Sequence, residues 1–176
     1  MNQDTRLQDL LDREAIRDCL YRYCRGIDRR DEEALRSAYW PDATDSHGAY
    51  QGSATGFINA ALEKLKTAGR MVHVLGNVLI ELHGDAAAAE SYFVAFQEEP
   101  AADGAPQETL LCGRYVDRLE KRGGEWRIAA RTVTYDWLRS TPLPASLAPE
   151  VFGPRQPTGG RRPDDPLYAL LAALRR

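Results

Sequence analysis

The chain has 176 residues, of which 43% are hydrophobic, and this suits one globular domain with its own core. Its 23 basic and 26 acidic residues are interspersed and give a net charge of −3, so nucleic acid is not an expected partner. No apolar run approaches the roughly 20 residues of a membrane span, and the polar, acidic N-terminus is unlike a signal peptide. We therefore expect no membrane association and a cytoplasmic location.

The cysteines and histidines are too scattered to predict a metal site. None of the spacings C-x-x-C, H-x-x-x-H or H-E-x-x-H occurs. The glycine-rich motifs that hold nucleotides are absent as well. The six residues concerned are Cys19, Cys24, Cys112, His47, His73 and His83. We expect no metal and no cofactor, and we expect His47 in a turn or at the rim of a pocket.

Three helices are predicted in the first part of the chain. The first begins near Thr5, and its apolar residues recur at steps of three or four down to Ile27. The second follows Asp31, a favourable N-cap, and Pro41 stops it. The third spans residues 55–66, where phenylalanine, isoleucine and leucine have the same spacing.

The periodicity then changes to that of strands. "RMVHVLGNVLIELHGD" and "AAAAESYFVAFQEE" predict two strands, and "ETLLCGRYVDRLEKRGGEWRIAARTVTYDWL" predicts two more, joined at "RGGE". "ATDSHGAYQG" allows a short additional strand between the second and third helices. Helices followed by an antiparallel run of strands predict an α+β fold, with helices packed on one face of a curved sheet.

The last part of the chain has a different composition. We expect a domain over residues 1–140 and an extension over residues 141–176, because seven of the ten prolines fall within residues 141–166. The ending "DPLYALLAALRR" predicts a short amphipathic helix. Its leucines are expected to pack either on the same domain or on a neighbouring subunit, and a homodimer or homotrimer is the expected assembly.

Three polar residues stand among apolar neighbours. Asp28 follows the apolar stripe of the first helix at Ile27, and His73 alternates with apolar residues in the first long strand. Arg131 lies in the last strand, on the face of Val133. Structural alternatives stay open: Asp28 as a cap of the second helix, His73 as a structural residue and Arg131 as a surface ion-pair partner.

A family resemblance lies in the order and spacing of the segments "REAIRDCLYRYCRGIDRRD", "YWPDA", "HGAYQG", "VHVLGNVLIEL" and "GRYVDRLEKRGGEWRIAAR". In these segments the chain resembles the SnoaL-like branch of the nuclear-transport-factor-2-like superfamily. The resemblance implies a cone of three helices and a strongly curved sheet around a pocket. That branch includes scytalone dehydratase and hexachlorocyclohexane dehydrochlorinase, cofactor-free lyases with an Asp–His pair. By comparison with the motifs of these two enzymes, the resemblance implies that Asp28 is the aspartate of the pair, His73 is the histidine and Arg131 is a cation of the pocket. Tyr23 replaces the lysine of the dehydrochlorinase and Asp45 replaces a pocket tryptophan, so an oxygenated substrate is expected.

The chemistry of these residue types agrees with that assignment. A histidine whose Nδ1–H donates to Asp28 keeps Nε2 free as a general base, and an arginine or tyrosine stabilises developing negative charge. The expected catalytic residues are His73, Asp28, Arg131 and Tyr23, and the expected pocket residues are Tyr21, Tyr135, Asn77, Tyr92, Val94, Phe96 and Trp40. Tyr92, Val94 and Phe96 share one face of their strand, and Phe93 points to the other.

These residues predict a cofactor-independent lyase acting on a hydroxylated aromatic, polycyclic or steroid-like small molecule. Dehydration is the leading reaction, and cleavage of a carbon–carbon bond with loss of an aldehyde would use the same base. Two alternatives remain: an isomerase or cyclase, or a non-catalytic binding or scaffold subunit such as the small subunit of a ring-hydroxylating dioxygenase.

Overall fold

A computed structural model describes residues 3–143 and 157–175 of the chain. The elements are α1 (Gln3–Arg29), α2 (Glu32–Ser37), β1 (Tyr39–His47), β2 (Tyr50–Ser53), α3 (Ala54–Leu65), β3 (Met71–His83), β4 (Ala86–Pro100), β5 (Pro106–Arg122), β6 (Glu125–Pro142) and α4 (Pro166–Leu174). The predicted helices and long strands are all present. The expected short strand is a hairpin, β1–β2, that pairs with the main sheet.

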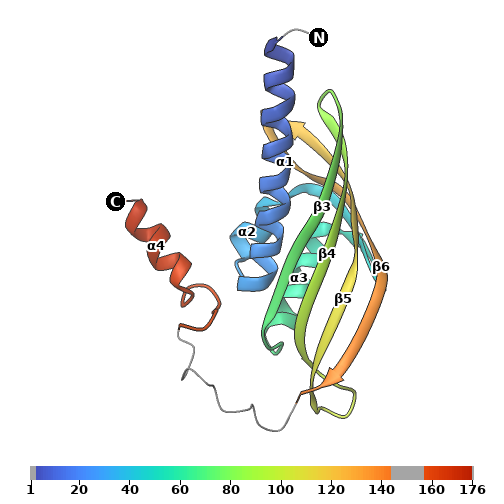
Figure 1. Cartoon of the computed structure of the whole chain (residues 1–176), viewed down its shortest axis with the longest axis vertical. Helices are drawn as coiled ribbons and strands as arrows, with labels where there is room; N and C mark the ends of the chain where they lie inside the picture. Colours follow the sequence, from blue (N-terminus) through green and yellow to red (C-terminus); the bar gives the residue numbers. More distant parts are fainter. Residues whose placement is uncertain (1–2, 144–156, 176) are drawn as a thin grey trace.

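The six strands form one open, mixed sheet in the order β2-β1-β6-β5-β4-β3. All neighbouring strands are antiparallel except β1 and β6, which are parallel. The sheet curves around α3 and the C-terminal half of α1 (Figure 1). The α+β class and the cone-like arrangement are therefore confirmed.

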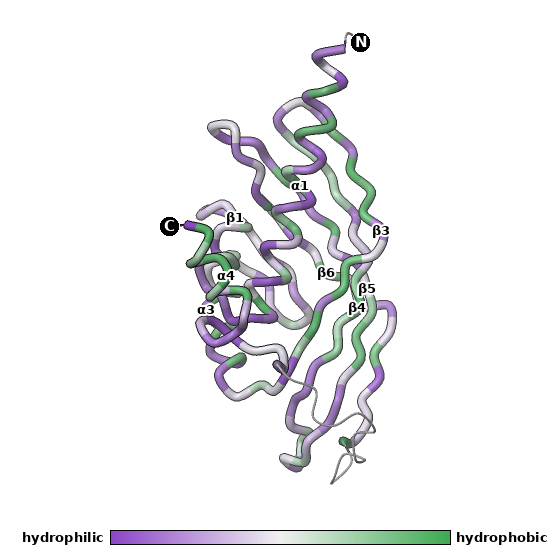
Figure 2. The backbone as a smooth tube through the Cα atoms, turned by 60° about the vertical axis from the view of Figure 1, so that its left-hand side comes forward, coloured by the Kyte–Doolittle hydropathy of each residue, from purple (hydrophilic) through white to green (hydrophobic). Residues whose placement is uncertain are grey.

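The C-terminal half of α1 supplies much of the core, and its N-terminal part projects beyond the sheet (Figures 1 and 2). The buried residues recur at helical spacing; they are Ile16, Cys19, Leu20, Tyr23, Cys24, Gly26 and Ile27. Leu7, Leu10 and Leu11 continue the same stripe, but each is more than half exposed. The first turns of α1 have no sheet to cover them.

The junction of α1 and α2 depends on a close approach at Gly26. A Cβ at this position would lie 2.6 Å from the Cα of Leu35 in α2, so only glycine fits. Arg30, with φ of 51°, ends α1, and Asp31 begins α2 by accepting from the backbone N–H of Ala34 at 3.1 Å. Because Asp31 caps α2, the side chain of Asp28 in the last turn of α1 is not needed for that role.

A bulge in β3 changes which residues face the core. The pairing of β3 with β4 shifts between Leu75 and Val78. Before the bulge, Met71, His73 and Leu75 face inward; after it, Val78 and Ile80 do so, and Asn77 is exposed. Simple alternation from His73 therefore predicts the wrong face for Asn77.

The C-terminal segment contacts the α1–α2 junction through polar groups. The backbone N–H of Arg162 donates to the carbonyl of Arg29 at 2.8 Å, and its guanidinium pairs with Asp31 at 2.7 Å. Helix α4 stands apart from the sheet (Figure 1), and none of its residues is buried; Leu170 is 57% and Leu174 is 74% exposed. The expectation for the proline-rich segment falls largely on residues 144–156, which lie outside the described residues.

Candidate functional site

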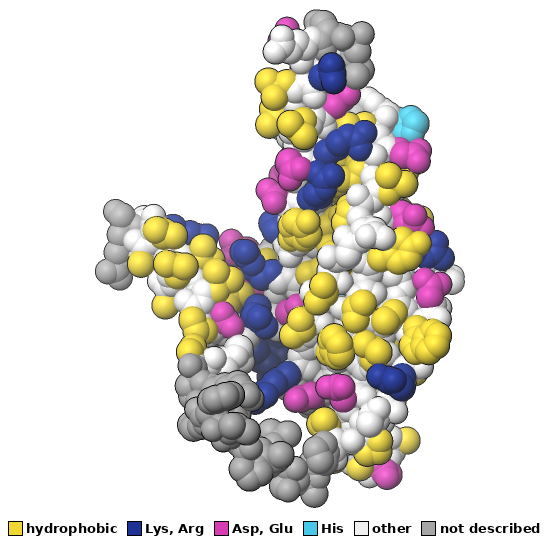
Figure 3. Space-filling view, in the orientation of Figure 1, with side chains coloured by type: hydrophobic (Ala, Val, Ile, Leu, Met, Phe, Trp, Pro, Cys, Tyr) yellow, Lys and Arg dark blue, Asp and Glu magenta, His cyan; other side chains and the backbone are white. Residues whose placement is uncertain are grey.

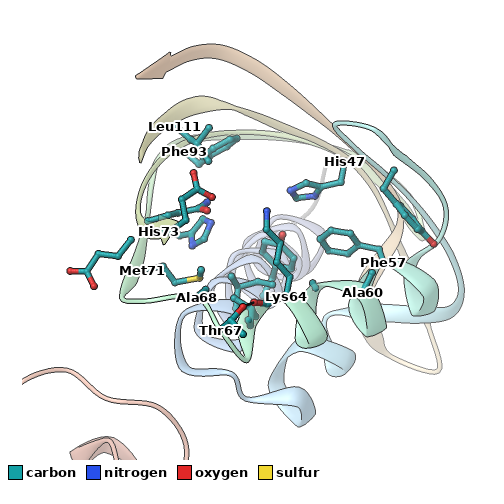
Figure 4. Close-up of a pocket in the computed structure, with 18 of the residues that line it drawn as sticks. His47, Phe57, Ala60, Lys64, Thr67, Ala68, Met71, His73, Phe93 and Leu111 are labelled. Atoms are coloured by element: carbon teal, nitrogen blue, oxygen red, sulfur yellow. Dashed lines mark hydrogen bonds between the residues drawn. The ribbon is translucent and has the colours of Figure 1, made fainter. Parts of the chain in front are cut away.

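A cavity of about 640 Å³ lies between the concave side of the sheet and the helices α1 and α3 (Figure 4). Its volume is in the range of small-molecule sites, roughly 300–1,000 Å³. Its wall is rich in aromatic rings and includes two imidazoles; these residues are Tyr23, His47, Phe57, His73, Phe93, Tyr115 and Tyr135. Charged side chains, among them Lys64 and Glu98, also line it. Such a site suits an apolar body with few polar groups.

Asp28 and His73 meet at this cavity, as predicted. Asp28 Oδ1 lies 2.6 Å from His73 Nδ1, and Oδ2 accepts the backbone N–H of His73 at 2.9 Å. Only 11% of the Asp28 side chain and 7% of the His73 side chain are exposed. An ionised carboxylate only accepts hydrogen bonds, so Nδ1 is the donor in this contact and Nε2 is left for another partner. The structure rules out Asp28 as the cap of α2, because Asp31 has that role.

Arg131 does not reach the cavity, and the expectation that it faces a substrate is wrong. Its side chain is 0% exposed and forms a bidentate ion pair with Asp117, with both N–O distances 2.7 Å. Its guanidinium lies 4.1 Å from the ring centroids of Tyr23 and Tyr115, which line the cavity in front of it. Burial alone would lower its pKa, but the Asp117 carboxylate raises the pKa of Arg131, so the group stays charged.

Tyr23 lines the cavity from α1 and is almost completely buried. Its ring packs edge-on against Tyr39 and Tyr115, at centroid distances of 6.0 and 5.5 Å. Burial raises the pKa of Tyr23 well above its ordinary value. The phenol of Tyr23 therefore keeps its proton at neutral pH.

Of the seven expected pocket residues, Tyr135 lines the cavity and the other six do not. Phe93 is the inward residue of β4, so Tyr92, Val94 and Phe96 face outward. Trp40 donates to the carbonyl of Glu120, and the guanidinium groups of Arg122 and Arg127 lie 5.0 and 4.9 Å from the centroid of its ring. Tyr21 is half exposed on α1, and Asn77 is exposed at the bulge.

Within residues 3–143 and 157–175, no three histidine, cysteine or acidic side chains gather as a metal site would require. None of the helices described is both long and apolar enough to cross a bilayer.

The model of the SnoaL-like domain family matches residues 8–132. The chain belongs to this family. Its match ends inside β6, so α4 lies outside the shared domain. No curated protein matches the chain.

Solved structures agree with the SnoaL-like assignment. A variant of Rv3472 from Mycobacterium tuberculosis, a protein of unknown function, is 26% identical over 73% of this chain and 74% of its own, with a TM-score of 0.62. Hexachlorocyclohexane dehydrochlorinase LinA-type3 from Novosphingobium barchaimii is 24% identical over 82% and 99%, with a TM-score of 0.66. A Novosphingobium aromaticivorans protein provisionally assigned as a scytalone dehydratase is 19% identical over 85% and 97%, with a TM-score of 0.64. The last two show that the fold is shared.

Several residues of the SnoaL-like cavity were not predicted from the sequence. Phe57 of α3 and Tyr115 of β5 occupy its wall, and Leu111 and Phe93 lie near His73 (Figure 4). From the sequence, Phe57 is one of the regularly spaced apolar residues of the third helix, and nothing in that pattern marks it as a cavity residue. Knowledge of how β4 and β5 align would predict the position of Tyr115, because it lies opposite Ser91, which is buried on the inner face of β4.

Proposed function

We propose that this SnoaL-like protein is a cofactor-independent lyase that dehydrates a hydroxylated aromatic, polycyclic or steroid-like small molecule. The observation that carries the proposal is the 2.6 Å contact between Asp28 and His73 Nδ1 at the wall of a largely aromatic cavity. Folds of this kind host lyases such as the dehydrochlorinase named above, so a lyase or isomerase activity is compatible with the similarities found.

The proposed reaction is an elimination from a β-hydroxy carbonyl compound. His73 Nε2 takes the proton from the carbon next to the carbonyl, and the electron pair of that C–H bond forms an enolate. The β C–O bond then breaks, and the hydroxyl leaves as water after it gains one proton. Asp28 stabilises the imidazolium that forms on His73, and Tyr23 donates a hydrogen bond to the enolate oxygen. Arg131 acts indirectly, because it fixes the rings of Tyr23 and Tyr115.

The alternative of a non-catalytic subunit is favoured by one observation, the apolar outer face of the sheet. Val74, Val94, Cys112 and Trp137 form a row across β3, β4, β5 and β6 on that face, opposite the cavity. Figure 3 shows hydrophobic side chains gathered over these strands. Such a face serves self-association as well as docking on an enzyme partner, so turnover decides between the two functions.

The test uses a tetralone that carries its hydroxyl group β to the ketone. Loss of water gives a dienone that tautomerises to naphthol, whose fluorescence reports turnover. We expect the protein to form naphthol, His73→Gln to lose about 10²–10⁴-fold in turnover, and the control His83→Gln, at an exposed strand end, to keep full activity. Absence of naphthol with the wild-type protein, or full activity in folded His73→Gln, would reject the proposal.

A further inference from the structure

A second aspartate–histidine pair lies on β1. Asp45 and His47 are two residues apart, so both side chains lie on the same face of the strand. The Asp45 side chain is 0% exposed, and its Oδ2 accepts the hydroxyl of Tyr39 at 2.7 Å. Its Oδ1 lies 3.5 Å from His47 Nδ1, and neither atom has a hydrogen-bond partner among the described residues. A buried carboxylate oxygen without a partner is costly, so the pair is poised to form a bond.

The ring of His47 is held in place at the wall of the cavity. It stacks on Phe57 with a centroid distance of 4.5 Å and an interplanar angle of 18°, and it meets the Tyr135 ring edge-on at 6.2 Å. Because Nδ1 is directed towards Asp45, Nε2 is the nitrogen left for a bound molecule. Figure 4 shows the imidazoles of His47 and His73 at different sides of the same cavity. Three strands separate β1 from β3 in the sheet, so its curvature brings the two rings to face one space.

We propose that His47 is the general acid of the dehydration, paired with Asp45, and this inference rests on the function proposed above. His47, protonated on both nitrogens, gives its Nε2 proton to the departing hydroxyl as the C–O bond breaks, and water leaves. In the same turnover His73 takes one proton from carbon, so the overall reaction conserves protons. Exchange with solvent restores both histidines. Asp45 stabilises the protonated ring when the 3.5 Å contact shortens to a charge-assisted hydrogen bond.

Other titratable side chains also line the cavity. They are Tyr23 of α1, Tyr50 of β2, Lys64 of α3, His73 of β3, Glu98 and Glu99 of β4, Tyr115 of β5 and Tyr135 of β6. Burial, with the charge of Asp45, raises the pKa of Tyr135, so its phenol is uncharged beside His47. Asp45 is the fully buried carboxylate beside His47, and its Oδ1 lies 3.5 Å from Nδ1 of that ring.

The test compares two leaving groups. A β-hydroxytetralone needs a proton on its leaving oxygen, whereas the β-acetoxy analogue loses acetate without one. We expect His47→Gln and Asp45→Asn to lower turnover of the hydroxy compound by about 10²–10⁴-fold and that of the acetoxy compound by less than about tenfold. The high-pH limb of the kcat/KM profile should disappear with His47→Gln. His73→Gln should lose activity on both compounds, and His83→Gln on neither.

His47→Phe is a second variant that keeps an aromatic ring on Phe57, and it should behave as His47→Gln does. Equal losses on both compounds, or none on the hydroxy compound, would overturn the role of His47 while the lyase function stands. A wild-type protein that converts neither compound would overturn the lyase function and the role of His47 with it.

Discussion

Asp28→Asn should change the tautomer of His73 without unfolding the protein. The carboxylate accepts two hydrogen bonds from one residue, at 2.6 Å from Nδ1–H and at 2.9 Å from the backbone N–H. An asparagine offers one acceptor and one NH₂ donor in the same space. If its oxygen faced Nδ1–H, the NH₂ group would oppose the backbone N–H, which cannot change its role. The stable arrangement therefore turns the NH₂ group towards Nδ1, and the ring proton moves to Nε2.

The magnitude follows from this exchange. With Nε2 protonated, His73 presents a donor to the cavity and loses its function as a base, so turnover should fall by about 10²–10⁴-fold. The number of hydrogen bonds stays the same, but they lose charge assistance, and the cost of a largely buried charge is removed with it. The free energy of unfolding should therefore change by no more than about 1 kcal/mol, and Tm by no more than about 4 °C.

Nitrogen-15 NMR of the imidazole rings shows which nitrogen carries the proton, and naphthol formation measures turnover on the same sample. His47→Gln and His83→Gln spectra assign the three histidines, and thermal melts confirm folding. A variant that keeps the proton on Nδ1 of His73 would refute the argument from hydrogen-bond geometry. A variant with the proton on Nε2 and unchanged turnover would refute the role of His73 as the base.

Four further outcomes are expected. Burial raises the pKa values of three tyrosines, Tyr23, Tyr39 and Tyr115. The free energy of unfolding should therefore stay constant up to about pH 10 and fall above it, because there the tyrosines ionise in the unfolded chain but not in the native state. Urea melts with tyrosinate absorbance measure this, and a midpoint that does not move above about pH 10 would contradict it. Arg131→Met should lower the free energy of unfolding by about 3–5 kcal/mol, because it leaves Asp117 buried without its partner. The double variant Arg131→Met/Asp117→Leu should recover much of that loss. A folded single variant with the stability of the wild type would contradict this. Sedimentation at micromolar concentration should show a dimer or trimer, and a species of only 19.7 kDa would disprove self-association. Turnover should survive exhaustive treatment with EDTA; a loss that zinc, iron or manganese restores would show that a metal takes part.

The order of elements was predictable because helical spacing and strand alternation mark each element. Asp28 and His73 each stand out as polar residues among apolar ones, but their pairing across 45 residues followed from the family resemblance. The sequence carries no comparable indication of which face of β4 points towards the cavity. Phe93 faces the cavity, yet Tyr92, Val94 and Phe96 on the other face are equally apolar, so polarity could not identify the inner side.

Long-range register explains the remaining errors. Arg131 lies directly opposite Asp117 on the neighbouring strand, and that pairing decides that the guanidinium is neutralised in the core. The turn at "RGGE" alone would align Asp117 with Ala130, but a bulge between Arg118 and Leu119 shifts the register by one residue and brings Arg131 opposite Asp117. The expectation that Asn77 lines the pocket is wrong for a related reason, because a bulge between Leu75 and Val78 shifts the alternation of side chains in β3.

The contact between Asp28 and the backbone of His73 has a consequence apart from chemistry. β3 is the last strand of an open sheet, and such an edge can template the addition of a strand from another molecule. Two side chains of α1 occupy its backbone groups: Asp28 accepts the N–H of His73, and Arg13 donates to the carbonyl of Ile80. The helix thus covers a surface on which fibrillar aggregation could begin. The residue proposed to orient the base also protects the edge, so loss of Asp28 is expected to lower solubility as well as the proposed activity.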